Sequence, residues 1–577
     1  MESFKNLFTW DKLKFIPILL FIGIMPLTVR LKTVHMEGLE KDWLPTPFVY
    51  SDIFNYYKAE LIFYSALLAI AFLIAGWVLG KTKYKMSIID KIALAFGAVV
   101  IVSSILSPYK EVVWRGYAER WHGARTWLSY IVMYFYFRIV IRDFQSRLDV
   151  TRIVLFSGLI MGSIGVFQLL GLDPLKAEIV KRMILPLDYV SQFGTEGISF
   201  TFEDTRVYLT LYNPNNVGLY AAAMLPFCVY GWMNEKSVMF KGLWSLFGVQ
   251  LILALVGSYS RAGIVAIVIA FGVYMVFNLS VFVLNGKKMV VGLVVLLLVA
   301  LLGNQLSGQI LTRRLGDVFN SRALYTKVEA VDVQGKVLLV NYNNQEVYFE
   351  YIQTPDGLVP TIYDAQESEL DVIENEEGDF VFNNEQLAGL KFRYISYTDI
   401  GIVVELVSGQ IKWPFAMTDE GYKYVNAFGK LVNVEASQSI GFEGKERLGS
   451  NRGYIWSRSL LLIKESPIFG SGADSFTLSF PQNDYINQGN VFGDTQKIVD
   501  KPHNQFIGLF IEFGLIGLGL FLAWFVGSVF TYRKDILSVS VLGIMISFMF
   551  YDISVGTGWI LIMTFGILTT DTIQEVS

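Results

Sequence analysis

The stretch VDKPHNQFIGLFIEFGLIGLGLFLAWF, residues 499–525, joins a polar beginning to a long apolar run. About 20 mainly apolar residues suffice to cross a bilayer, so it predicts a spanning helix that runs without a break from residue 503. His503 and Asn504 lie at the start of this helix. Glu512 lies about two and a half turns further along at 3.6 residues per turn, so we expect it to meet a polar group of another span instead of the imidazole.

The composition places the whole chain in the membrane class. Of 577 residues, 53% are hydrophobic and 17% are charged, whereas soluble globular proteins carry about 25% charged residues. The formal net charge is −4, and basic residues form no block interleaved with aromatic residues. With no zinc-ligand spacing either, the sequence gives no support for nucleic-acid binding.

The hydropathy pattern predicts an all-α polytopic membrane protein with about twelve spanning helices. Basic loops tend to stay in the cytoplasm, and five net-basic loops fall on one side if the N-terminus is cytoplasmic: 81–85, 138–152, 234–241, 285–288 and 532–535. We therefore expect both termini inside the cell. The expected spans are 13–30, 59–80, 88–106, 126–142, 151–171, 214–233, 242–259, 262–284, 288–304, 503–531, 536–551 and 555–570.

Four long segments then fall on the outer face, namely 31–58, 107–125, 172–213 and 305–502. The last is too long for a structureless loop. Within it, KVEAVDVQGKVLLVNYNNQEVYFEYI alternates apolar and polar residues around a glycine and an Asn-Asn turn signal, and LKFRYISYTDIGIVVELVSGQIKWPFAM repeats this style. Such alternation is typical of strands, so we expect an inserted extracytoplasmic β-rich domain.

The chain therefore divides into four predicted parts. They are an N-terminal membrane domain of about nine spans at 1–304, an insert at 305–455 with its β-rich core near 322–445, a loop at 456–502, and a C-terminal membrane segment of about three spans at 503–577. An amphipathic pattern over 451–476 ends at Pro467 and is too short and too charged to cross. We expect it at the outer interface, with Arg452, Arg458 and Lys464 facing water or lipid phosphate.

Two outer motifs place an arginine beside a helix end. SYSRAG, residues 258–263, puts Arg261 at a tight turn between two spans; the arginine either pairs there or snorkels to headgroups. RVYLTLYNPNNVG puts Arg206 ahead of Asn213 and Asn215. Asn-Pro-Asn is a turn and helix-start signal, and the start of a helix offers free N–H groups to an anion.

A third outer motif, WRGYAERWHGARTWLSY at 114–130, holds Arg115, Arg120 and Arg125. Three arginines in an outer loop run against the positive-inside bias, so they need partners. Phosphate is one partner because guanidinium binds it bidentately. Structural salt bridges, for example with Glu119, are the competing explanation.

His503 gives this set of outer arginines a chemical partner. A neutral imidazole accepts a proton from a hydroxyl near pH 7, although a single histidine is more often a structural residue. A base beside several phosphate-binding candidates indicates a reaction in which a hydroxyl attacks a sugar whose leaving group is a diphosphate.

Together, these motifs resemble those of the O-antigen ligase and O-antigen polymerase superfamily of bacterial multi-spanning membrane proteins. The resemblance rests on SYSRAG, on Arg206 ahead of NPNNVG, on ERWHGARTWLSY, and on GYIWSRSLLLIKESPIFGSGADSF followed by HNQFIGLFIEFGLIGLGLF. It covers residues 60 to 570. The resemblance implies a C-type glycosyltransferase fold in the bacterial cytoplasmic membrane and an inverting transfer of a glycan from undecaprenyl diphosphate to an acceptor hydroxyl on the outer face.

The resemblance also implies roles for individual residues. His503 would activate the acceptor hydroxyl, and Arg261 and Arg206 would hold the diphosphate and stabilise the charge that develops as it leaves. It implies no metal, no other cofactor and no nucleotide sugar. The further candidate substrate contacts are Arg120, Arg115, Asn213, Asn215, Asn504 and Arg452.

Several alternatives stay open. Members of this superfamily ligate glycans to lipid A core, polymerise repeat units or glycosylate proteins, so the acceptor is a glycan, a lipid or a protein, and the insert is an acceptor-docking or partner-binding module. From other classes, a lipid-linked glycan transporter or flippase would show internal repeats, and twelve spans are excessive for a sensor anchor. A metal-dependent transferase is a subsidiary rival, with candidate ligands His35, Glu37, Glu40 and Asp42.

Overall fold

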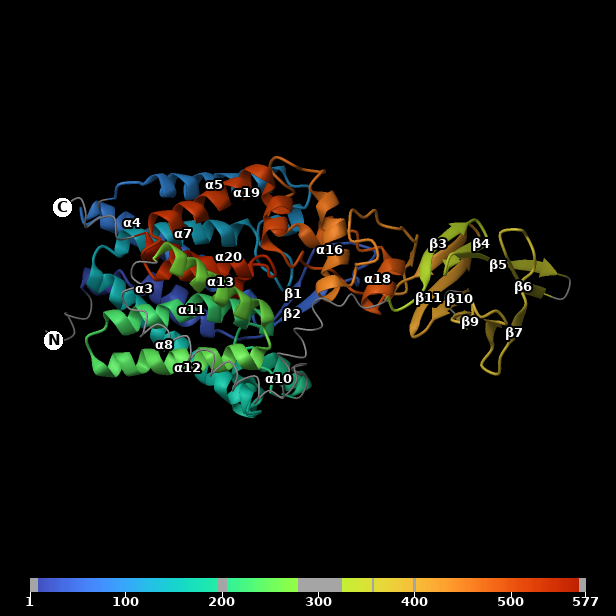
Figure 1. The fold of residues 1–577 in the computed structure, drawn as a ribbon, viewed down its shortest axis with the longest axis horizontal. Helices are drawn as coiled ribbons and strands as arrows, with labels where there is room; N and C mark the ends of the chain where they lie inside the picture. The colour runs from blue at the N-terminus through green and yellow to red at the C-terminus, as the bar shows by residue number, and fades with distance from the viewer. Residues whose placement is uncertain are drawn as a thin grey trace.

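The computed structural model describes residues 9–82, 84–195, 205–278, 324–354, 357–397 and 401–569. Helices form a bundle in one half of the elongated molecule, and two β-sheets form the opposite end (Figure 1). The bundle helices are α4 (Tyr56–Val78), α5 (Ile88–Leu106), α7 (Ala124–Val140), α8 (Phe144–Leu169), α11 (Pro214–Asn234), α12 (Val238–Ser258), α13 (Arg261–Phe277), α19 (Gln505–Thr531), α20 (Leu537–Ser547) and α21 (Val555–Leu568).

The described helices support a membrane protein. Five of them, α4, α5, α8, α12 and α19, are long and apolar enough to cross a membrane. The other expected spans from 126 onward coincide with the shorter or less apolar helices α7, α11, α13, α20 and α21, and the span expected at 288–304 lies outside the described residues.

The first expected span, 13–30, is wrong as a single helix. It is divided into α2 (Trp10–Leu13), α3 (Ile16–Ile18), a π-helical turn η1 (Leu19–Ile24) and a 3₁₀ turn η2 (Met25–Leu27). Pro17 and Pro26 lie inside the segment, and proline lacks the N–H that an α-helix interior requires. The pieces still pack against the bundle, because Phe21 and Ile22 are fully buried.

Aromatic side chains hold the bundle together around α19. Phe96 of α5 lies edge-on to Phe513 of α19, with ring centroids 5.6 Å apart. Further along, Trp524 packs on Tyr134 of α7 at 5.0 Å and on Phe565 of α21 at 4.8 Å. Such pairs contribute about 0.5–1.5 kcal/mol each beyond the area they bury. They place α19 at the centre of contacts with α5, α7 and α21.

The α19 helix is kinked, so the expectation of an unbroken helix is wrong. Gly514 adopts φ 66° and ψ −169°, and a Cβ there would lie 2.2 Å from the carbonyl oxygen of Ile468. The chain around Pro467 lies against the opened backbone: Leu515 N–H donates to the Pro467 carbonyl, and Gly472 N–H donates to the Glu512 carbonyl. The glycines of PIFGSG and of IEFG therefore allow two backbones to meet.

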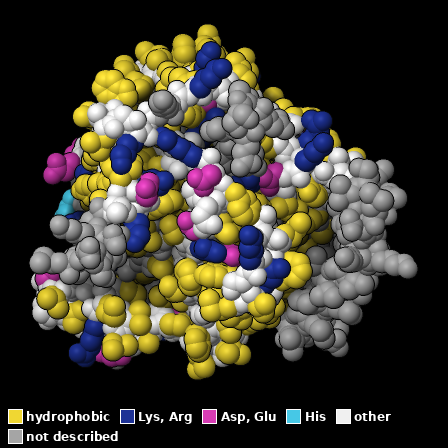
Figure 2. All heavy atoms as spheres, turned by 90° about the vertical axis from the view of Figure 1, so that its left-hand side faces the viewer, with side chains coloured by type: hydrophobic (Ala, Val, Ile, Leu, Met, Phe, Trp, Pro, Cys, Tyr) yellow, Lys and Arg dark blue, Asp and Glu magenta, His cyan; other side chains and the backbone are white. Residues whose placement is uncertain are grey.

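The end of the bundle remote from the sheets carries charged side chains. Figure 2 shows Lys and Arg spread over this end among hydrophobic side chains, with Asp and Glu interspersed. Several arginines of the loops expected to be cytoplasmic are buried and paired across helix ends, with Arg138 Nε 3.0 Å from Asp90 Oδ1 and Arg147 Nη2 2.5 Å from Asp535 Oδ2. These ion pairs hold together the loops and helix ends at this end of the bundle.

Short elements cover the other end of the bundle. They are the hairpin β1 (Lys32–His35) and β2 (Val49–Asp52), with α6 (Lys110–Val113), η3 (Pro174–Lys176), α9 (Glu178–Ile184), α10 (Leu187–Phe193), α16 (Leu448–Leu462), α17 (Phe476–Ser479) and α18 (Tyr485–Phe492). In Figure 1, α16 lies crosswise to the bundle helices, between them and the sheets. Arg458 of α16 does not face water or lipid, because it is 5% exposed and its Nε lies 3.3 Å from Asp484 Oδ2. This part of the interfacial-helix prediction is wrong, since the guanidinium is buried with a carboxylate.

Two antiparallel sheets lie between α13 and α16 in the sequence. Turns at Gly335 and at Asn343-Asn344 separate the first three strands, so the strand prediction for this stretch is confirmed. One sheet contains β3 (Val328–Gln334), β4 (Val337–Tyr342), β5 (Gln345–Thr354) and β6 (Gly357–Tyr363). The other runs β13-β12-β11-β10-β9-β8-β7 and contains β7 (Val372–Glu374), β8 (Asp379–Phe382), β9 (Leu390–Tyr397), β10 (Gly401–Ser408), β11 (Ile411–Thr418), β12 (Gly421–Val425) and β13 (Leu431–Val432).

The two sheets share one hydrophobic core, in which Phe349 of β5 stacks on Phe392 of β9 at 4.7 Å. Helix α18 closes this core, since Tyr485 stacks on Tyr424 at 4.4 Å. A second attachment joins the sheets to the first loop: Lys430 Nζ donates to carbonyl oxygens of residues 41 and 44, at 3.1 and 3.0 Å. The sheets are therefore attached to α18 and to the β1–β2 connection, two of the elements that cover the bundle, while the four-part domain division stays a prediction.

Candidate functional site

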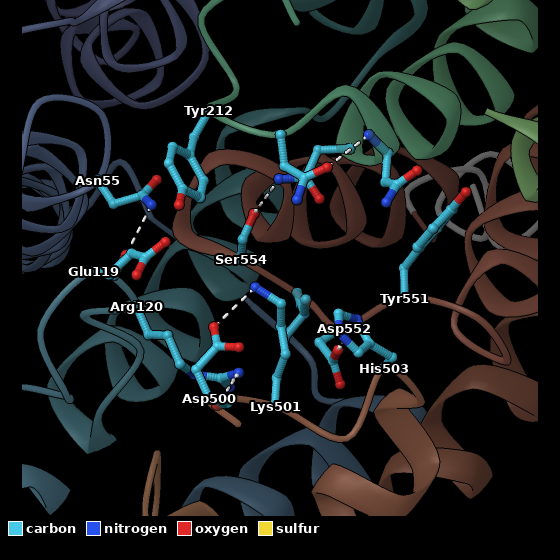
Figure 3. A pocket seen from close by; sticks show the side chains of 14 residues that line it. Asn55, Glu119, Arg120, Tyr212, Asp500, Lys501, His503, Tyr551, Asp552 and Ser554 are labelled. Atoms are coloured by element: carbon cyan, nitrogen blue, oxygen red, sulfur yellow. Dashed lines mark hydrogen bonds and ion pairs between the residues drawn. The ribbon is translucent and has the colours of Figure 1, made fainter. Parts of the chain in front are cut away.

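A cavity opens where the bundle meets its covering loops. Its lining comes from the start of α4, the loop before α7, the start of α11, the segment before α19 and the loop before α21 (Figure 3). Segments distant in the sequence thus meet at one hollow. The lining residues are Asn55, Glu119, Arg120, Tyr212, Asn213, Asn215, Asn216, Asp500, Lys501, His503, Tyr551, Asp552, Ile553 and Ser554.

His503 lines this cavity immediately before α19. Its ring is 31% exposed, and its Nδ1 lies 3.8 Å from Oδ2 of the buried Asp552. Burial lowers the pKa of the imidazole well below its ordinary value, and the nearby Lys501 and Arg452 lower it further. The ring is therefore neutral at pH 7, which is the protonation state that a general base requires.

Asp552 is the carboxylate that faces this imidazole. Its Oδ2 is buried and has no hydrogen-bond partner within the described residues. Burial raises the pKa of the Asp552 carboxyl group, while the positive charges of Arg120 and Lys501 lower it. A 3.8 Å separation is too long for a hydrogen bond, but catalytic contacts often tighten only when substrate binds. A bond from Nδ1–H to Asp552 would leave Nε2 as the proton acceptor.

Two basic side chains contribute positive charge to the cavity lining. Lys501 Nζ lies 2.9 Å from Asp500 Oδ2, and the Lys501 side chain is 23% exposed. Arg120 Nε lies 2.5 Å from Asp474 Oδ1, and its Nη2 lies 3.7 Å from Glu512 Oε1. Arg120 is therefore paired with buried carboxylates, whereas the side chain of Lys501 is partly exposed in the cavity.

Besides α4, whose first N–H groups donate to the Asp52 carboxylate, three of the described helices begin at the cavity. Asn213 caps α11 by accepting from Asn215 N–H, Asn504 caps α19 by accepting from the N–H groups of residues 506 and 507, and Ser554 caps α21. The N-terminal end of a helix carries a partial positive charge and free N–H groups. Three such ends beside Lys501 make the cavity suited to an anion.

The two predicted diphosphate arginines, Arg206 and Arg261, are not among the residues that line this cavity. The α12–α13 turn reaches the cavity through Ser260 Oγ, which is 2.9 Å from the hydroxyl of Tyr551, and Arg261 follows directly as the first residue of α13. Arg206 lies under the same turn, with its guanidinium carbon 6.0 Å from the centroid of the Tyr259 ring. Its Nε is buried and has no hydrogen-bond partner in the described part of the chain.

The other predicted substrate contacts lie in four different surroundings. Arg120, Asn213 and Asn215 line the cavity. Asn504 is a helix cap instead of a lining residue. Arg452 lies beside the cavity and donates to the Phe550 carbonyl at 3.2 Å, with its Nε buried and unpartnered among the described residues.

Arg115 lies outside the lining and is 60% exposed. Together with Arg125 it contacts Glu60 of α4, at 3.6 and 2.5 Å. The competing explanation for these arginines, structural salt bridges, is supported by the structure, although the carboxylate partners are Glu60, Asp474 and Glu512 and not the example Glu119. The expectation that Glu512 meets a polar group of another span holds only for its backbone, whose carbonyl accepts from Ser103 Oγ of α5 at 2.6 Å, because its carboxylate pairs with Arg120 of a loop.

Sequence reasoning missed four charged residues of this site. Asp500 and Lys501 stand directly before the quoted histidine motif, so their closeness to His503 was available as a signal. Asp474 belongs to the GADSF signature and holds the cavity loop by accepting from the N–H groups of Tyr117 and His122, at 2.8 and 3.1 Å. Asp552 offered no local signal, because it lies 49 residues after His503 in an apolar region.

The structure describes no site for a metal ion. In the described ranges, no group of three or more His, Cys, Asp or Glu side chains lies close enough together to hold one. His35 belongs to β1, and Glu37, Glu40 and Asp42 follow it in the β1–β2 connection.

Residues 402–522 match the family model described as O-Antigen ligase. The matched stretch begins in β10, ends in α19 after its kink, and includes the PIFGSG segment and His503. Neither a curated protein nor a solved structure matches the chain.

Proposed function

Because the match over residues 402–522 supports membership of the O-antigen ligase superfamily, we propose that this chain transfers a glycan from undecaprenyl diphosphate to an acceptor hydroxyl at the outer face of the cytoplasmic membrane. The match supports an O-antigen ligase or polymerase type of function in general. The donor, the acceptor class and the outward orientation are proposals, as are the twelve spans and the C-type glycosyltransferase architecture.

One observation carries the proposal: a neutral imidazole and an anion-binding surface share one cavity. His503 lies beside Asp552, and Lys501 and the starts of α11, α19 and α21 border the same hollow. A base alone would serve many reactions, and an anion site alone would serve binding. Together they suit a hydroxyl attack that expels an anionic leaving group.

The proposed step balances without a co-reactant. The acceptor oxygen forms a bond to the anomeric carbon, and its proton passes to Nε2 of His503. The bond between the anomeric carbon and the diphosphate oxygen breaks, and undecaprenyl diphosphate leaves with the electron pair. Lys501, the helix starts and the guanidinium groups of Arg261 and Arg206 would stabilise the charge on that oxygen, with Asp552 holding the imidazole in the required tautomer.

The direct test supplies the purified protein with an undecaprenyl-diphosphate oligosaccharide and an acceptor-containing envelope fraction. We expect release of undecaprenyl diphosphate together with a new glycosidic bond. His503→Ala and Arg261→Ala should abolish turnover while the protein remains expressed and folded. Full activity in both variants contradicts the site assignment, and loss of turnover in EDTA favours the metal-dependent rival.

Glycan profiling of a deletion strain separates the two transferase classes. Full-length chains left on carrier lipid indicate a ligase, and shortened chains indicate a repeat-unit polymerase. If the chain were a flippase, its deletion would instead leave lipid-linked glycan on the inner leaflet. The purified protein would then release no undecaprenyl diphosphate.

A further inference from the structure

The cavity has two chemically different sides. Figure 3 shows His503, Asp552 and Tyr551 on one side, and Asn55, Glu119 and Tyr212 on the other. The proposed function uses the first side and the charges between the two. It assigns nothing to the side formed by Glu119 and its neighbours.

Glu119 differs from the other charged residues of its loop. Arg115, Arg120 and Arg125 each contact a carboxylate, whereas Glu119 forms no ion pair within the residues that the structure describes. Its carboxylate is half-buried and lines the cavity. The hydroxyl groups of Tyr212 and Tyr50 donate to this carboxylate. A carboxylate has about four lone-pair sites, so a half-buried one that faces a hollow can accept further hydrogen bonds from the hydroxyl groups of a ligand.

The backbone holds this side chain in an unusual conformation. Glu119 has φ 73° and Tyr212 has φ 66°, and His503 on the opposite side has φ 52°. Residues other than glycine rarely adopt positive φ, and such conformations concentrate at ligand-binding and active sites. Three of them line this one cavity, which indicates that the fold aims these side chains inward.

Helix α4 fixes the position of the Glu119 backbone. Asn55 Nδ2 donates to the Glu119 carbonyl at 2.8 Å. Asp52 accepts from Asn55 N–H at 2.7 Å and from Trp121 Nε1 at 2.9 Å, so it ties the start of α4 to the residues that follow Glu119. The carboxylate is thus presented on a rigid support, as recognition of a defined hydroxyl pattern requires.

The chemistry of this side suits a neutral polyhydroxylated ligand. A carboxylate accepts hydrogen bonds, a phenol donates and accepts, and an amide does both. Burial raises the pKa of Glu119, and Asp500 raises it further, while Lys501, Tyr212 and Tyr50 lower it. A phosphate would be repelled by Glu119 and Asp500, whereas sugar hydroxyls would satisfy them.

We propose that Glu119, together with Tyr212, binds hydroxyl groups of the sugar ring attached to the donor's diphosphate. This assignment rests on the proposed function. It makes Glu119 a residue that determines which donor sugar is accepted, separate from the proton transfer at His503. A site built to bond a hydroxyl discriminates strongly against a sugar that lacks it.

The test compares two ligands that share the lipid diphosphate. One is undecaprenyl diphosphate, and the other is the lipid-linked glycan isolated from a strain that lacks this gene. Glu119→Gln should weaken binding of the glycan lipid about ten-fold, as expected for loss of one charge-assisted hydrogen bond, and leave undecaprenyl diphosphate binding unchanged. Tyr212→Phe, which removes only a hydroxyl, should act in the same direction, and Glu111→Gln on the exposed face of α6 is the matched control.

Each possible outcome either supports or overturns the assignment of Glu119 to the donor sugar. Unchanged binding of both lipids in both variants overturns the assignment, and so does an equal loss for both lipids, which would make Glu119 a general support of the fold. An effect confined to the KM of the acceptor also overturns it. If wild-type protein binds neither lipid, the proposed function fails first. Where Glu119→Gln does not fold, Tyr212→Phe carries the same comparison.

Discussion

Replacing Arg120 by alanine tests whether this arginine chiefly stabilises the fold or serves as a ligand for phosphate. Its side chain is 10% exposed, and the carboxylates it contacts are 0% exposed at Asp474 and 3% exposed at Glu512. Arg120→Ala leaves both carboxylates buried without their cation. Breaking a buried pair from one side costs about 3–5 kcal/mol, so we expect a large loss of stability.

Arg115→Ala is the matched control. Arg115 lies in the same loop but is 60% exposed, at 3.6 Å from Glu60. Exposed pairs contribute about 0–1 kcal/mol, so this variant should unfold close to the wild-type temperature. The measurement is the apparent melting temperature of the purified proteins in one detergent. Equal melting temperatures for both variants refute the buried-cluster argument.

A second substitution identifies the cause. In the Arg120→Ala background, Glu512→Gln removes one of the stranded charges and should recover part of the lost stability, whereas Glu512→Gln alone should be destabilising. The double-mutant cycle then shows a coupling between the two positions, as expected of residues in contact. Additive effects contradict the 3.7 Å ion pair as an energetic contact.

Three further results are expected. Transfer activity should fall as the pH is lowered through the raised pKa of Asp552, because protonation removes the charge that orients His503. The Asp552→Asn variant should have a lower rate, and its activity should no longer fall in this acid range. If the variant shows the same acid fall as the wild type, another group causes it. Gly514→Ala should lower the folded yield more than Gly519→Ala, since a Cβ at 514 meets backbone at 2.2 Å and one at 519 meets nothing within 4 Å; similar yields would contradict the kink. Lys430→Ala should increase hydrogen exchange of residues 41–46 while strands β10 and β11 stay protected, and unchanged exchange would mean that this attachment is not needed.

Local patterns in the sequence identified much of the secondary structure. Apolar runs marked helices α4 and α5, alternation marked strands β3 to β5, and the asparagines at 213 and 504 marked helix starts. The turn at SYSRAG was also readable, with Tyr259 in the left-handed conformation between α12 and α13. Each of these features depends on residues within a few positions of one another, so composition and spacing determine them.

The site could not be predicted in the same way, because the side chains that contact one another there are distant in the sequence. His503 meets Asp552 across α19 and α20, and Arg120 meets Asp474 across most of the chain. Nothing local distinguishes an arginine that binds a buried carboxylate from one that faces a phosphate.

The same reason explains the kink in α19. A glycine in an apolar helix is common, and only the approach of the PIFGSG backbone makes Gly514 leave the helical conformation. The sequence alone thus determined the membrane class, most of the helices and strands, and the identity of the candidate base. Tertiary packing decided which charges neutralise one another and which remain open to a ligand, because ion pairing depends on distance in space and not on separation along the chain.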